Sequence, residues 1–371
     1  MMNNSISKNR IEGLDFARAL AMFGMLLMNF VVVTGAKGNG SPMLVWFTNL
    51  FEGRAAATFV ILAGIGISLM TRRARLTNEK ALIQKTRFSL LKRSIFLFVL
   101  GMLLYTLGWA GDILHYYGVY MALATLLIMA SPKIIVLLLF IFSLGAQFYQ
   151  VAFDYMNGWS PTKPFLEYLD FWTVSGFLRN LFFNGFHPVF PWICFLFIGL
   201  LIGRLNLVES KIRKTILLVS SLTLIVTELL SRFLIYTFAN SNVGTNSATF
   251  LFETGPIPPN LFYLLSNTAS SLIIIILSMY VAEKFSHNLI IRSIIYSGQL
   301  ALTHYVSHVV IGIGILLVMD RVILFNGFEH QPLSFTFLYS CLFFIGSILF
   351  SVLWRVRFKR GPIELVMRKC S

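Results

Sequence analysis

The sequence consists of long apolar stretches separated by short polar connections. A run of about 20 apolar residues is the length that an α-helix needs to cross the hydrocarbon core of a bilayer. Of the 371 residues, 57% are hydrophobic and only 12% are charged, whereas a soluble domain carries roughly 25% charged residues. So few charges cannot cover the surface of a soluble protein. We therefore predict an all-α, polytopic transmembrane helical bundle that forms one domain, residues 1–371.

Ten stretches are long and apolar enough to be spans. The first carries Asp15 and Arg18 at its start and exceeds a signal-peptide core, so we read it as a retained span. The predicted spans are 14–34, 54–71, 89–107, 112–130, 133–151, 188–205, 215–238, 260–282, 296–318 and 335–354.

Basic residues lie in alternate connections between these spans. Of the 30 Lys and Arg residues, 23 fall on the side that holds the N-terminus, the 72–93 connection and the C-terminal tail, and 4 fall in the opposite loops. Cytoplasmic loops of membrane proteins carry such an excess. We therefore expect a multi-pass membrane protein with both termini in the cytoplasm. The same distribution explains the net charge of +15, so we predict no nucleic-acid partner. The expected partner is the lipid bilayer.

Polar residues within spans are costly and indicate function. Most of them here lie near the outer ends of the predicted helices, where they could line one polar cavity. A histidine near a carboxylate in such a cavity is a plausible general base, because its pKa lies near neutrality. The candidates are Asn29, Glu52, Arg54, Asp112, His115, His187, Glu228 and Arg232, with His304 in the middle of its span.

Several of these residues also have simpler structural explanations. Glu228 and Arg232, four residues apart, suit an ion pair within one helix. His304 and His308 have the same spacing and resemble two metal ligands, but no third ligand has matching spacing, so we predict no metal site. The sequence contains no nucleotide-binding loop, nucleophile elbow or zinc-protease motif, which leaves ATP-driven transport and ordinary hydrolase chemistry without support.

Six motifs occur in order over essentially the whole chain: Leu14-Asp15-Phe16-Ala17-Arg18 with Met28-Asn29, Phe51-Glu52-Gly53-Arg54, Gly111-Asp112-Ile113-Leu114, Pro188-Val189-Phe190-Pro191-Trp192, Gly298-Gln299-Leu300-Ala301 through Tyr305, and Gly361-Pro362-Ile363-Glu364 with Arg368. Together they resemble the YeiB-like family of bacterial membrane proteins. The resemblance implies a multi-pass protein of a bacterial cytoplasmic (inner) membrane.

That family is similar to transmembrane acyltransferases that include the heparan-α-glucosaminide N-acetyltransferases. The resemblance implies transfer of an acyl group, in particular acetyl, from cytosolic acyl-CoA (acetyl-CoA) to a small-molecule, glycan or other envelope acceptor. Those enzymes use a histidine in the first outer loop, but the stretch from Asn29 to Arg54 contains none.

The base must then come from another loop, and His115 and His187 are the nearest candidates by topology. Asp112 or Glu52 would orient it, and Arg54 would hold an anionic group or a developing oxyanion. We expect Asn29, Glu228, Arg232 and His304 to contribute to substrate binding.

Two other functions stay open at this point. Polar residues within spans, such as Glu228, Arg232 and His304, would also serve a proton-coupled secondary transporter or exporter of a small molecule, although the sequence shows no inverted repeat. A non-catalytic assembly or sensing protein is the third reading. The oligomeric state is open as well, a homodimer included.

Overall fold

The computed structural model describes residues 10–241, 244–319 and 331–371, and these ranges are helical, with one isolated β-bridge between Trp159 and Tyr168. The helices, of which η1 and η2 are π-helical, are α1 (Glu12–Val33), α2 (Pro42–Asn49), α3 (Arg54–Thr77), α4 (Lys80–Thr106), α5 (Leu114–Leu127), α6 (Pro132–Ala152), α7 (Val174–Arg179), η1 (Asn180–Asn184), α8 (Val189–Ile202), α9 (Ser210–Ala239), α10 (Thr245–Phe252), α11 (Leu261–Lys284), α12 (Leu289–Gln299), α13 (Ala301–Ser307), η2 (His308–Ile313), α14 (Gly314–Met319), α15 (Leu333–Arg357) and α16 (Pro362–Cys370).

Within these ranges, 8 helices are long and apolar enough to cross a membrane, and up to 9 if the bent pair Val174–Asn184 and Val189–Ile202 counts as one span. The prediction of an all-helical transmembrane bundle is therefore confirmed. The predicted span 112–130 corresponds to α5, which has only 14 residues and rises about 21 Å. It packs as a hairpin against α4 and touches α8, so it lies within the bundle although it is shorter than a typical span.

The predicted span 296–318 is broken rather than continuous. α12 ends at Gln299 and α13 begins at Ala301, and seven residues further along, from His308, the helix becomes π-helical. A π-helical turn inserts one residue into the hydrogen-bond ladder, and such turns occur frequently at functional sites. The break leaves backbone N–H groups at the start of α13 without helical partners, and other side chains must satisfy them.

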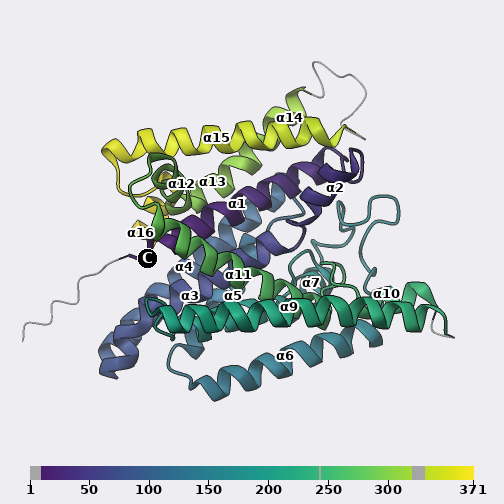
Figure 1. Cartoon of the computed structure of the whole chain (residues 1–371), viewed down its shortest axis with the longest axis horizontal. Helices are drawn as coiled ribbons and strands as arrows, with labels where there is room; N and C mark the ends of the chain where they lie inside the picture. The colour runs from purple at the N-terminus through teal and green to yellow at the C-terminus, as the bar shows by residue number, and fades with distance from the viewer. Residues whose placement is uncertain (1–9, 242–243, 320–330) are drawn as a thin grey trace, which may run out of the picture.

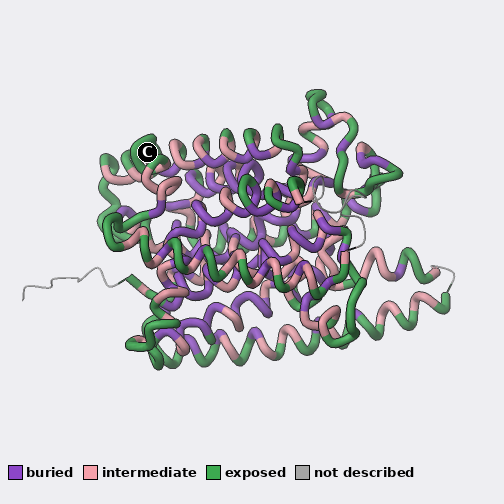
Figure 2. The backbone as a smooth tube through the Cα atoms, turned by 90° about the horizontal axis from the view of Figure 1, so that it is seen from above, coloured by how far each residue is buried: buried purple, intermediate pink, exposed green. Residues whose placement is uncertain are grey.

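Most helices run between two ends of the bundle (Figure 1). One end, which we call the basic end, holds Arg10 at the start of the described chain, α12, α16 and the C-terminus; α2, α7 and α10 lie at the opposite end, which we call the far end. In their most apolar windows, α1 and α11 are 61% buried, whereas α6, α9 and α15 are only 22% buried. α1 and α11 therefore form the centre, and α6, α9 and α15 present apolar side chains to lipid. Figure 2 shows the same pattern, with buried segments in the middle of the bundle.

Small residues bring the central helices together. A Cβ on Gly64 of α3 would lie 2.3 Å from the backbone oxygen of Leu196 on α8, and 2.8 Å from Cα of Gly199. Lipid is as apolar as the helices, so the hydrophobic effect does not drive them together, and close backbone contacts of this kind supply the van der Waals attraction instead. Within the sequence Ala63-Gly64-Ile65-Gly66, Gly64 is therefore the residue that lets α3 and α8 approach closely, whereas Gly66 has no atom within 4 Å of an added Cβ.

Candidate functional site

Two cavities enter the bundle from opposite ends. The first, of about 360 Å³, lies toward the far end; we call it the aromatic cavity. The second, of about 370 Å³, lies toward the basic end; we call it the arginine cavity. Both are within the size range of small-molecule sites.

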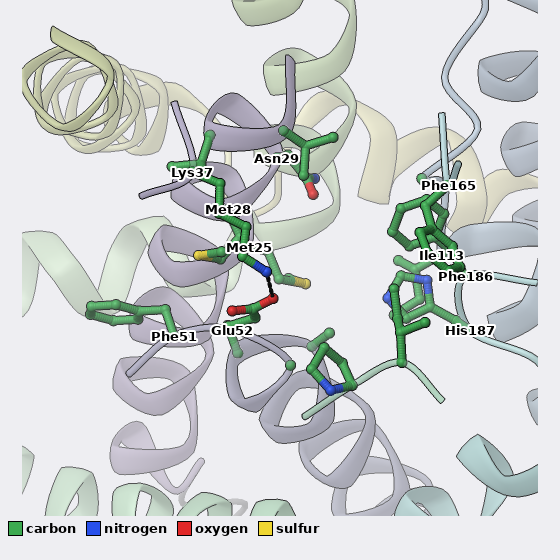
Figure 3. A pocket seen from close by; sticks show the side chains of 18 of the residues that line it. Met25, Met28, Asn29, Lys37, Phe51, Glu52, Ile113, Phe165, Phe186 and His187 are labelled. Atoms are coloured by element: carbon green, nitrogen blue, oxygen red, sulfur yellow. Dashed lines mark hydrogen bonds and ion pairs between the residues drawn. The ribbon is translucent and has the colours of Figure 1, made fainter. Parts of the chain in front are cut away.

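The aromatic cavity is formed by the end of α1, the starts of α3 and α8, α13, and the connections at the far end of the bundle (Figure 3). Rings and aliphatic chains form most of its surface. The principal ones are Met25, Met28, Phe51, Trp109, Ile113, Phe165, Leu166, Phe186, Trp192 and Ile257.

The loop 152–187, which contributes several of these side chains, is folded rather than free. Asn184 accepts from Tyr168 at 2.8 Å and its backbone oxygen accepts from Trp159 Nε1 at 2.8 Å. Arg179 donates to both oxygens of Asp170 at 2.6 Å and to the Tyr168 hydroxyl at 2.9 Å. Burial raises the pKa of Tyr168, so its phenol stays protonated and can donate. These bonds hold the loop in one conformation over the cavity.

Besides the Tyr305 hydroxyl, the aromatic cavity contains four polar side chains: Asn29, Lys37, Glu52 and His187. Glu52 accepts from Lys37 Nζ at 2.5 Å, and Asn29 Nδ2 lies 2.8 Å from Nε2 of His308. His187 stands on the other side, with its ring against Trp192 at a centroid distance of 4.5 Å (Figure 3). His187 Nδ1 is unpartnered within the described structure. This nitrogen is buried, and His187 is the histidine among the residues that line the cavity.

Asp112 and His115 lie beside the aromatic cavity but do not line it, and neither is exposed at all. The Asp112 carboxylate accepts from His115 Nδ1 at 2.9 Å, from His115 N at 3.0 Å and from the Tyr305 hydroxyl at 3.1 Å. The Tyr305 hydroxyl in turn accepts from Ile113 N at 3.0 Å. This buried network ties the connection before α5 to α13, and so fixes the floor of the cavity.

Gly101 on α4 makes room for this network. A Cβ at that position would lie 2.2 Å from His115 N and 2.5 Å from an oxygen of Asp112. Because real Cβ atoms do not approach other atoms so closely, no residue with a side chain fits there without displacing the Asp112–His115 turn.

The arginine cavity collects basic side chains at the opposite end. Arg10 and Arg18 line it and share Asp15, with which they form ion pairs at 2.5 and 2.6 Å. Arg93 lines it too and forms no ion pair among the described residues; its closest polar contact is the Met70 sulfur at 3.4 Å. Arginine is suited to phosphate, to which its planar guanidinium can donate two parallel hydrogen bonds.

Glu364, on the C-terminal helix α16, closes one side of the arginine cavity. Its carboxylate accepts from the backbone N–H groups of Leu302 and Thr303 at 2.9 and 3.1 Å and from the Thr303 hydroxyl at 2.5 Å. These are N–H groups at the start of α13, which the break in this span leaves without helical partners. The Gly361–Glu364 motif of the sequence therefore serves as a helix cap supplied from a distant segment.

A thin wall separates the two cavities. Ile113 lines the aromatic cavity, and its neighbour Leu114 lines the arginine cavity. On α13, Tyr305 faces the first and Ala301 the second; on α3, the lining changes between Ala56 and Phe59. Three or four residues advance an α-helix by about 5 Å. One helical turn therefore divides a cavity at one end from a cavity at the other.

Other residues singled out from the sequence lie outside both cavities. Glu228 accepts from Ser266 at 2.6 Å and pairs with Arg54 on α3 at 3.5 Å, and this contact joins α9 to the centre of the bundle. Arg232 is exposed, and among the described residues Glu228 pairs with Arg54 rather than with it. His304 bonds Ser351 of α15 at 2.6 Å. The described part of the chain contains no group of three or more His, Cys, Asp or Glu residues that could hold a metal ion.

Sequence reasoning missed Trp109, Trp192, Tyr305 and Arg93, although two of these belong to motifs that it quoted. An apolar or aromatic residue inside a span gives no signal of its own, since most such residues face lipid or the core. A signal was present for Arg93, which is the last of eight cations in the 72–93 connection; such a connection could attract a polyanionic donor such as CoA, although topology explains its charge without any ligand.

The fold and the two cavities define a polytopic membrane protein with one cavity open toward each end. The family model of the heparan-alpha-glucosaminide N-acetyltransferase catalytic domain matches residues 10–238. The chain belongs to this family of transmembrane acetyltransferases. A second model, of a protein family of unknown function that corresponds to the YeiB-like proteins, matches residues 202–371, so the resemblance drawn from the sequence motifs is confirmed. No curated protein matches the chain.

Proposed function

We propose that this protein transfers an acyl group, in particular acetyl, from acyl-CoA in the arginine cavity to an acceptor in the aromatic cavity. The observation that carries this proposal is the wall, one helical turn thick, between two cavities that open toward opposite ends. A pantetheine arm is long and narrow, so it suits a thioester that must reach through such a wall.

The arginine cavity has the chemistry that a CoA donor needs. Arg93, free of ion pairs among the described residues, and Arg10 and Arg18, which share one carboxylate, provide positive charge for the phosphates. Leu62, Leu97 and other apolar side chains line the cavity, where they would surround the pantetheine chain.

The aromatic cavity would hold the acceptor and its base. The acceptor's amine or hydroxyl attacks the thioester carbonyl carbon; a C–N or C–O bond forms and the C–S bond breaks. His187 takes the proton from the attacking group, and the proton ends on the CoA thiolate as it leaves. Glu52 and Asn29, across the cavity from His187, orient the acceptor. The buried Asp112–His115 pair fixes the geometry through Tyr305.

The excess of Lys and Arg at the basic end supports a cytoplasmic location for that end, and the match to the YeiB-like family supports a bacterial inner membrane. The donor would then arrive from the cytosol, and the acceptor would lie on the outer side. A membrane enzyme of this kind joins two substrates that are kept on opposite sides of a bilayer.

The experiment is a transfer assay in lipid nanodiscs, with labelled acetyl-CoA and glucosaminide acceptors. We expect His187→Ala to lower kcat by about 100-fold or more, the usual contribution of a general base. His287→Ala is the matched control, because His287 is exposed and outside both cavities. Wild-type turnover in His187→Ala would remove this residue from the mechanism.

A second pair of variants tests the donor site. Arg93→Gln should raise the KM for acetyl-CoA by about tenfold, the equivalent of one lost charge-assisted hydrogen bond. Arg87→Gln on the same helix, exposed and outside the cavity, should leave it unchanged. Equal KM values in the two variants would argue against this placement of the donor.

A proton-coupled carrier is the second candidate, because two cavities that face opposite ends across a thin wall also suit alternating access. Proteoliposomes discriminate between the two functions. Proton-dependent flux of a small molecule without any acyl transfer would favour the carrier.

A further inference from the structure

The aromatic cavity also indicates which class of acceptor the protein takes, an inference that rests on the proposed function. We propose that the acceptor is a membrane-held amphiphile, a polar amine or alcohol head on an apolar chain, that enters from the leaflet at the far end. The alternative is a free, water-soluble sugar.

The surface of the cavity is the first argument. Polar side-chain groups are few: they lie on α1, on the adjoining connection, at His187 and at the Tyr305 hydroxyl, and most of the remaining side chains are methionine, aliphatic or aromatic. A site for a free sugar needs a hydrogen-bonding partner for most of its hydroxyl groups, because each unpaired group costs free energy when it leaves water. An apolar surface instead stabilises a bound hydrocarbon chain.

The rim of the cavity is the second argument. Leu166 lines the cavity and is 50% exposed, so it lies where the cavity opens. Around this end of the bundle, other apolar residues stand out from the surface: Trp172 is 67%, Val174 79% and Trp46 60% exposed. Tryptophan at such positions is typical of the headgroup region of a bilayer. The rim therefore lies in the interface, where a lipid-anchored acceptor is concentrated.

The backbone at Phe165 is the third argument. Its φ of 63° lies in the left-handed region, which a bulky residue rarely adopts and which the surrounding structure must enforce. In this conformation the ring lines the cavity and packs on Trp159 at a centroid distance of 5.1 Å. The strained backbone of Phe165 thus places an aromatic ring next to the rim of the cavity.

Acyl transfer to two acceptors with the same head tests the inference: methyl α-glucosaminide and dodecyl α-glucosaminide, with the protein in nanodiscs. Burial of roughly two methylene groups corresponds to about a tenfold gain in affinity. We therefore expect kcat/KM for the dodecyl compound to exceed that for the methyl compound by at least about 100-fold.

Because partition into lipid alone raises the local concentration of the dodecyl compound, two rim variants are needed. Leu166→Glu should raise its KM by about tenfold or more and leave the KM for acetyl-CoA unchanged. Leu169→Glu, in the same loop and 62% exposed but outside the cavity, should stay within about twofold of the wild type. Both leucine side chains are exposed to solvent or lipid, so neither substitution creates a cavity in the core, and we expect both variants to fold.

A photoreactive dodecyl glucosaminide measures binding without turnover. It should label wild type and Leu169→Glu, and label Leu166→Glu much less. Equal kcat/KM for both acceptors, or equal labelling of the two variants, would overturn the amphiphile proposal and leave the acyltransferase proposal intact. Selective labelling without transfer to any acceptor would overturn the acyltransferase proposal and retain the amphiphile site.

Discussion

Substitution of Gly101 by alanine tests the network that fixes the wall between the cavities. The added Cβ would lie 2.2 Å from His115 N and 2.5 Å from an Asp112 oxygen. An ordinary contact is about 3.5 to 4.0 Å, so the turn before α5 must move by more than 1 Å or the bonds from Asp112 to His115 and Tyr305 must break.

The expected free-energy change combines two opposing effects. Overpacking of a filled core costs about 1–3 kcal/mol, and alanine in place of glycine within a helix stabilises by about 1 kcal/mol. We therefore expect Gly101→Ala to be destabilised by roughly 1–2 kcal/mol. A displacement of this size at a reacting centre also lowers activity, so we expect at least about a tenfold loss of acyl transfer.

Thermal unfolding and transfer rates in nanodiscs measure both effects. Gly145→Ala in α6 is the matched control, because nothing lies within 4 Å of the added Cβ; its stability should be unchanged or higher. If Gly101→Ala behaves like Gly145→Ala in both assays, the close approach of α4 to the Asp112–His115 turn is wrong.

Three further outcomes follow from other contacts. Glu364→Ala should lower the free energy of unfolding by about 1 kcal/mol, the usual loss of a helix cap, which the unfolding midpoint measures. Glu209→Ala is the control, because Glu209 is exposed and its side chain caps no helix. An equal shift of the midpoint in both variants would reject the cap. Glu228→Gln should cost under about 1 kcal/mol, since both partners of its ion pair with Arg54 are about a quarter exposed, and Arg232→Ala should cost less still; the reverse order would contradict the pairing found here. A membrane-impermeant thiol reagent should label exposed Cys370 in inverted vesicles and not in intact spheroplasts; the opposite result would invert the proposed orientation.

The membrane-spanning character of the chain could be predicted from composition and the lengths of the apolar runs, because both reflect the thickness and low polarity of the bilayer. The motifs also gave the family correctly. The break at Leu300 could not be predicted, because the cap that stabilises it comes from Glu364, about 60 residues further along the chain.

The candidate site was predictable only in part. Clustering of polar residues at the outer ends of spans correctly brought Asn29, Glu52 and His187 to one cavity. The same argument included Arg54 and Glu228, which instead pair with each other beside the cavity, because helix position gives the depth of a residue and not the direction in which it points.

The sequence alone determined that the chain crosses the bilayer many times as helices, since transfer of each segment into lipid depends mainly on its own residues. Tertiary structure decided which of these segments are neighbours, and hence that Ile113 and Leu114 face different cavities. That choice depends on the fit of side chains from distant segments, such as Gly101 beneath the Asp112–His115 turn, and no local pattern encodes it.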